Sequence, residues 1–129
     1  MASELRVNTL KDASGNNSIG MSYVAEGSAK AWCSYSMQST NAIRGSFNVS
    51  SQTDTANSHS TIAWTNTMVE GYAAGGMSSD QKMLCANNAN ADAYNTALSA
   101  SSGKFSSVSD GGTDSDSDTN TVAIHGDLA

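Results

Sequence analysis

Apolar and polar residues alternate along several short segments of the chain. In AWCSYSM, Cys33, Tyr35 and Met37 fall on one side of an extended backbone while Trp32 falls on the other. A period of two is the spacing of side chains along a β-strand, whereas a helix has a period of 3.6. We therefore expect this segment to be a strand with one buried face.

The same spacing recurs in three further segments. Its apolar positions are Ile43, Phe47 and Val49 in AIRGSFNVS, Ile62, Trp64 and Met68 in TIAWTNTM, and Val122, Ile124 and Leu128 in TVAIHGDLA. Polar runs over residues 51–60, 86–98 and 110–120 are predicted to be loops between strands. About seven or eight short strands separated by polar turns are typical of a sandwich or barrel.

The N-terminal residues carry a weaker form of this pattern. Leu5 and Val7 alternate with polar residues, and DASGNN at 12–17 has the composition of a turn. We expect residues 1–30 to form an arm or hairpin with little core of its own. The predicted fold is all-β: an antiparallel, jelly-roll-like β-sandwich over residues 31–129, preceded by this short N-terminal arm.

The supply of large apolar side chains is small. Only 38% of the 129 residues are hydrophobic, much of that fraction is alanine, and there are two Phe, two Trp and four Tyr. The abundant Ser, Asn and Asp disfavour long helices because their side chains compete for backbone hydrogen bonds. A core this small predicts further burial against copies of the chain or against a scaffold.

The net charge argues against several classes of partner. It is −6, with only six Lys and Arg scattered along the chain, so no basic stripe is available for phosphates or for an anionic membrane. No apolar run approaches membrane-spanning length. MASELRVNTL also lacks the basic start and apolar stretch of a signal peptide. We therefore expect no nucleic-acid binding, no membrane insertion and no secretion.

The residues that could carry catalysis are few and isolated. Cys33 and Cys85 are too few for a disulfide framework, so buried free thiols are favoured and one disulfide is the alternative. His59 and His125 have no carboxylate or cysteine nearby at ligand spacing. A triad with one of the many serines would be uninformative. The sequence predicts a protein that is not an enzyme.

An acidic run near the C-terminus is the strongest local pattern. Asp114, Asp116, Asp118 and Asn120 alternate with Ser and Thr, and alternate oxygens can converge on Ca²⁺. The glycine and distal glutamate of an EF-hand are missing, and three carboxylates repel one another without a cation. An extended, solvated loop is thus the default interpretation, with calcium as the alternative and no other cofactor expected. A depolymerase would need paired carboxylates in a cleft, which only this run could supply.

Aromatic residues are the first candidates for an interface. Trp32, Tyr35 and Tyr72 could supply binding energy to a partner protein or stack on sugars. The alternative is that they fill the core, which is favoured because other large residues are scarce. Trp64 shares a face with Ile62 and is expected in the core.

Two further polar residues are interface candidates. Arg44 could bridge to the acidic loop of an adjacent subunit, although a solvated side chain is the simpler expectation. His125 lies opposite the apolar face of the last predicted strand, so it would face solvent or a neighbouring subunit.

Four segments occur in a recognisable order along the chain. They are ASELRVNTLKDASGNNSIGMSYVAEGSAKAW, AIRGSFNVSS with the TD turn after it, TNTMVEGYAAGG, and the C-terminal VAIHGDLA. Together they resemble a family of short tail-fibre-like and virion structural proteins of marine and cyanobacterial bacteriophages. The similarity is least over residues 78–120. Cys33, at an aliphatic strand position, and His125, before Gly-Asp-Leu-Ala, depart from the family pattern.

The resemblance implies an antiparallel β protein on the surface of the virion, made in the host cytoplasm and often a homotrimer. It implies a tail-fibre-like component that attaches to other phage structural proteins and contacts a host surface glycan or protein. The alternative is a capsid decoration protein, a cement or head-fibre protein that stabilises the head shell. The family brings no catalytic residues with it.

Overall fold

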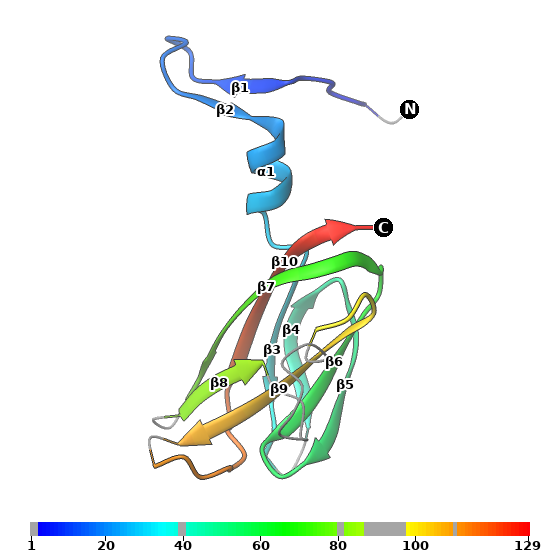
Figure 1. Ribbon diagram of the computed structural model, residues 1–129, viewed down its shortest axis with the longest axis vertical. Helices are drawn as coiled ribbons and strands as arrows, with labels where there is room; N and C mark the ends of the chain where they lie inside the picture. The colour runs from blue at the N-terminus through cyan, green and yellow to red at the C-terminus, as the bar shows by residue number, and fades with distance from the viewer. Residues whose placement is uncertain (1–2, 39–40, 80–81, 87–97, 110) are drawn as a thin grey trace.

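Two four-stranded antiparallel sheets form the body of the molecule (Figure 1). The computed structural model of the chain describes residues 3–38, 41–79, 82–86, 98–109 and 111–129. The first sheet has the order β4-β3-β10-β7, with strands β4 (Ala42–Phe47), β3 (Ala31–Ser36), β10 (Asn120–Leu128) and β7 (Met68–Ser78). The second has the order β5-β6-β9-β8, with strands β5 (Val49–Ala56), β6 (His59–Trp64), β9 (Ser102–Ser109) and β8 (Lys82–Ala86). The predicted all-β antiparallel sandwich is confirmed.

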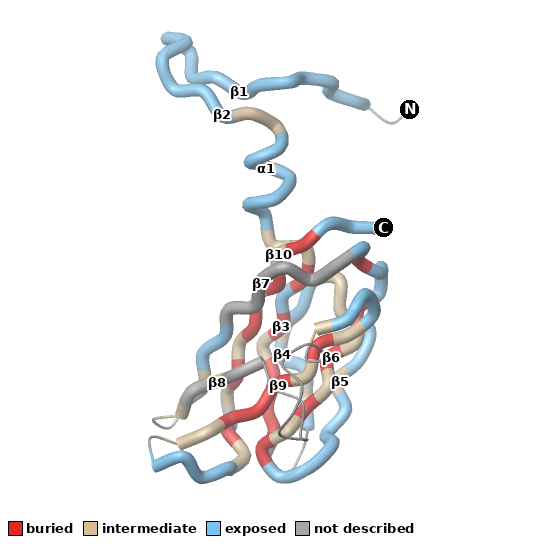
Figure 2. The backbone as a smooth tube through the Cα atoms, viewed as in Figure 1, coloured by how far each residue is buried: buried red, intermediate tan, exposed pale blue. Residues whose placement is uncertain are grey.

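The core lies between the two sheets, where alternate residues of the central strands meet (Figure 2). In β3, Cys33 and Tyr35 are buried while Trp32 is 45% exposed, as the period of two predicted. The other core residues are Ala31, Met37, Ile62, Trp64, Met68, Phe105, Val122 and Ile124. Trp64 therefore packs in the core as expected.

A bulge in β4 changes the face on which its apolar residues lie. Ser34 pairs with Gly45 but Tyr35 pairs with Ile43, so Arg44 is an extra residue in the strand. Paired residues of neighbouring strands share a face. Ile43 therefore lies on the inner side with Tyr35, while Phe47 pairs with Trp32 on the outer side. The prediction that Ile43 and Phe47 share a face is wrong.

The polar run 51–60 is not a loop. Residues 49–56 form β5, which pairs with β6, and only the turn at Asn57 and Ser58 separates the two strands. Ser58 adopts a φ of 65° in that turn. The strand was misread because β5 is the edge of its sheet and has no buried residue, so it needs few apolar side chains.

Leu128 also departs from its predicted place. It belongs to β10, which pairs with β7. The register of this pairing shifts between His125 and Gly126 and between Asp127 and Leu128. Val122 and Ile124, before these shifts, are buried, whereas Leu128 beyond them remains 44% exposed. The last strand is therefore half-buried only over its first part.

Residues before β3 form an arm that extends from one end of the sandwich (Figure 1). It consists of the paired strands β1 (Thr9–Lys11) and β2 (Ser18–Gly20), followed by the short helix α1 (Met21–Gly27). The helix was not predicted. The β1–β2 turn is held by Asp12, whose carboxylate accepts hydrogen bonds from the Ser14 hydroxyl and the Asn16 backbone N–H. These bonds lower the pKa of Asp12, the Ser14 bond most strongly.

Candidate interaction surfaces

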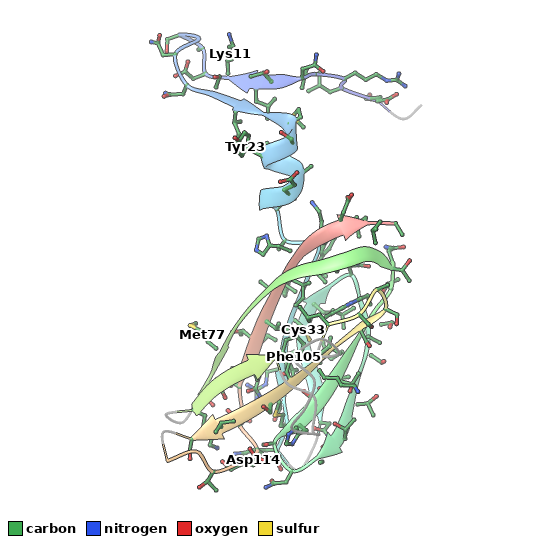
Figure 3. The ribbon with its side chains drawn as sticks, in the orientation of Figure 1. Lys11, Tyr23, Cys33, Met77, Phe105 and Asp114 are labelled. Atoms are coloured by element: carbon green, nitrogen blue, oxygen red, sulfur yellow. The ribbon has the colours of Figure 1, made fainter. Side chains whose placement is uncertain are left out.

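The turn between β5 and β6 and residues 111–119 lie side by side at the end of the sandwich opposite the arm. Asn57 Nδ2 donates to the Asp114 carbonyl oxygen at 3.2 Å, and the Ser58 N–H donates to Asp116 Oδ1 at 2.7 Å. Asp114 is exposed at this end, which Figure 3 shows. We call this surface, made by residues 57–58 and 111–119, the distal end. It is polar and rich in hydrogen-bonding groups.

Arg44 binds the acidic segment of its own chain. Its Nη2 lies 2.6 Å from Asp118 Oδ1, and its Nη1 donates to Thr119 Oγ1 at 2.6 Å. The Ser36 hydroxyl also donates to Asp118, at 3.5 Å. This pairing lies within one chain and the Arg44 side chain remains 45% exposed, so its contact with an adjacent subunit stays a prediction.

Three of the four residues proposed for calcium have side-chain partners that differ from one another. Asp116 accepts from Ser58, Asp118 pairs with Arg44, and Asn120 is fully buried with its Nδ2 donating to the Ser117 carbonyl oxygen. Among the described residues, no three His, Cys, Asp or Glu side chains form a group that could hold a metal. Ser117 of this segment is buried and its two preceding residues are half-buried, whereas residues 111–114 and Asp118 are exposed, so the segment is packed only at its centre.

Cys33, His59 and His125 lie on three different strands, β3, β6 and β10. Cys33 is a buried free thiol, and burial raises its pKa from 9.0 to about 11. The side chain of Cys85 lies outside the described ones. His59 is the first residue of β6 and is half-buried, so it does not lie in a loop as expected. Its Nδ1 lies 2.7 Å from the carbonyl oxygen of Asn57 in the preceding turn. His125 is half-buried on β10, where it pairs with Ala73.

An apolar hollow lies on the outer face of the β4-β3-β10-β7 sheet. It has a volume of about 360 Å³ and is lined by residues of β3, β10 and β7, namely Trp32, Cys33, Ser34, Gly76, Met77, Thr121, Val122 and Ala123. Trp32 lies over Gly45, and Phe47 pairs with Trp32 on the next strand. Met77 is 74% exposed and points away from the sandwich (Figure 3). We call this surface the aromatic face.

The other aromatic candidates have different places. Tyr35 is fully buried and its hydroxyl accepts a hydrogen bond from Ser60 at 3.1 Å, so its predicted interface role is corrected to a core role. Its position on the inner side of β3 is the physical reason, because the inner residues of that strand face the second sheet. Tyr72 belongs to β7, but its side chain lies outside the described ones.

Sequence reasoning missed Phe47 and Met77 as surface residues. Phe47 was assigned to an inner face because the bulge at Arg44 leaves no mark in the residue order. Met77 belongs to a Gly-rich strand whose two faces differ little in composition. The pairing of Met77 with Thr121, itself two residues from Ala123, is what places it beside the outer residues of β10.

Comparisons with known proteins add no relative. No family model matches the chain, and no curated protein and no solved structure matches it either. In the part of the chain that the structure describes, no helix is both long enough and apolar enough to cross a membrane.

Proposed function

We propose that the chain is a non-enzymatic structural protein of a bacteriophage particle, and specifically a tail-fibre-like component that adheres to the host. The arm is the observation that carries this proposal. Residues 3–28 include no buried residue, yet they expose five large apolar side chains, which are Leu5, Val7, Leu10, Ile19 and Tyr23. Such a segment gains little from its own chain and gains stability when another chain covers it.

The placement of the surfaces supports an adhesive role. The arm leaves one end of the sandwich and the polar distal end lies at the other (Figure 1). A fibre component needs one end for attachment and the other for contact, and recognition commonly uses polar loops on a rigid β scaffold. In this proposal the arm binds sister copies or other phage structural proteins, and the distal end contacts a host surface glycan or protein. Three copies would sum weak contacts by avidity.

The aromatic face favours the second candidate, a capsid decoration protein. Its hollow is bounded by the exposed side chains of Trp32 and Met77, and an exposed apolar surface of this kind marks a protein contact. A decoration protein would press such a face against shell subunits and thereby stabilise the head. Both candidates place the protein on the surface of the virion after synthesis in the host cytoplasm.

Imaging of intact particles with a labelled antibody against the chain tests the proposal. Label at the tail fibres supports the adhesive component, and label distributed over the head lattice supports the decoration protein. Purified particles without the chain would contradict both. As a matched functional readout, an antibody against the distal end should block adsorption of particles to cells only if the chain is the adhesive component.

A further inference from the structure

The hollow of the aromatic face has the chemistry of a site for apolar side chains. None of the described residues that line it is charged, and Trp32 and Met77 at its rim are 45% and 74% exposed. Phe47, 54% exposed, extends the apolar surface beside Trp32. A charged or strongly polar ligand would lose hydration here without gaining a counter-charge. The volume of about 360 Å³ has room for a pair of aliphatic side chains.

The start of the arm presents a matching pair. Residues 3–7 are extended, precede β1 and belong to no sheet in the described structure. Leu5 is 78% exposed and Val7 is 36% exposed, and their alternate spacing puts them on one side of an extended chain. Glu4 and Arg6, on the other side, form an ion pair at 2.8 Å. The segment thus offers an apolar side together with balanced charges.

This segment does not lie over the hollow of its own chain. The strands of the arm pair with each other, and α1 contacts β2 and β10 (Figure 1). The arm thus leads residues 3–7 away from the sandwich. A second copy carries the same unfilled hollow, so each copy can give one arm and receive another.

We propose that residues 3–7 of one copy bind the aromatic face of a second copy, with Leu5 and Val7 packed into the hollow between Trp32 and Met77. The contact joins two different surfaces, so repetition closes a ring or extends a filament. A closed ring of three would give the homotrimer of the proposed function. This inference rests on the proposed assembly role, to which it adds the partner and the two surfaces.

Complementary variants of the full chain test the contact by sedimentation over a concentration series. Met77→Glu places a carboxylate at the hollow, and the double change Leu5→Glu with Val7→Glu places two carboxylates on the arm. Thr53→Glu, on the exposed part of β5, is the matched control. We expect the native chain and the control to associate. Each spoiled variant alone should associate at least about a hundredfold more weakly, because an unpaired carboxylate would be buried in an apolar contact.

A one-to-one mixture of the two spoiled variants is the decisive sample. It contains one intact arm and one intact hollow per pair, so a heterodimer is expected. Assembly of the Met77→Glu chain alone would indicate arm-to-arm contact, and assembly of the arm variant alone would indicate face-to-face contact. Either result would overturn the proposal, as would a mixture that stays monomeric.

Cysteine pairing provides a second measurement that needs no added charge. In chains that also carry Cys33→Ala and Cys85→Ala, Leu5→Cys is mixed with Met77→Cys under mild oxidation. A disulfide-linked heterodimer is expected, whereas Thr53→Cys in place of Met77→Cys should not react. Equal reaction of the two acceptors, or a native chain that is monomeric at every concentration, would refute the contact. The position of the chain on the particle would be unaffected by that result, since imaging measures it separately.

Discussion

Cys33 and Tyr35 are neutral groups in the core whose ionisation opposes folding. Burial raises the pKa of Cys33 from 9.0 to about 11 and raises the pKa of Tyr35 above its ordinary value of 10.0. The unfolded chain loses these protons at lower pH than the folded chain, so the stabilisation is complete below pH 9 and declines as pH rises toward 11. We expect the melting temperature to fall over that interval, and to fall less steeply in a Cys33→Ala, Tyr35→Phe variant. An unchanged slope in the double variant would contradict this explanation.

Gly103 allows the side chains of β9 and its neighbour to pack closely. A Cβ atom at this position would lie 2.8 Å from the Phe105 ring and 3.1 Å from Leu98 Cδ2. Gly103→Ala should therefore lower the free energy of unfolding by about 1–3 kcal/mol, as overpacking does. Gly111→Ala is the control because its nearest neighbour, Ser109 Oγ, would be 3.9 Å away. Urea denaturation of both variants measures the difference, and equal stabilities would show that the core relaxes around the methyl group.

At the residue scale, the sequence predicted positions within a strand better than partners across the fold. The alternation in β3 placed Cys33 inside and Trp32 outside because that rule is local. The partner of Arg44 is Asp118, which is 74 positions away, and no local rule connects the two. Asn120 was assigned to a surface ligand set because it follows an acidic run, whereas the start of β10 buries it completely. Partners of this kind depend on the sheet order, which the residue pattern does not specify.

The segment that connects β9 to β10 is where a calcium site was predicted. Residues 111–119 contact the β5–β6 turn and Arg44 through protein groups, so added calcium has no group of three carboxylates to bridge among the described residues. We expect the same melting temperature with calcium and with a chelator. A rise with calcium that disappears in the Asp114→Asn variant would instead establish a calcium site at the distal end.

The arm is an element whose loss should leave the sandwich stable. Residues 3–28 contain no buried side chain, and the arm joins the core near Lys30, whose N–H donates to the Ile124 carbonyl oxygen. A chain that starts at Ala29 should keep its free energy of unfolding within about 0.5 kcal/mol of the full chain. The measurement is made at low concentration, because association would otherwise add to the stability of the full chain. A loss of several kcal/mol would mean that the arm packs on its own sandwich.

Elements with one buried face were predictable and those with none were not. β3, β6 and the first part of β10 have alternating apolar residues because one side of each faces the other sheet. β5 is polar between Val49 and Ala56 at its ends and α1 has no buried residue, so neither leaves an apolar period in the sequence. The order of strands in the sheets could not be predicted from the sequence either, because it depends on which faces meet after folding.

At the scale of the whole molecule, the balance between charge and apolar contact decides how assembly responds to salt. Each chain carries a net charge of −6, so copies repel one another at low ionic strength. The proposed contact places Leu5 and Val7 in a hollow whose described lining residues carry no charge, and Glu4 already pairs with Arg6 in the same arm. Salt then screens the repulsion without weakening the contact. We expect the apparent association constant from sedimentation to rise or stay level as sodium chloride is increased to about 1 M, where the Debye length is only about 3 Å. Dissociation over that range would mean that ion pairs between copies hold the assembly, and the contact would then have to be sought among the charged residues of the arm and the distal end.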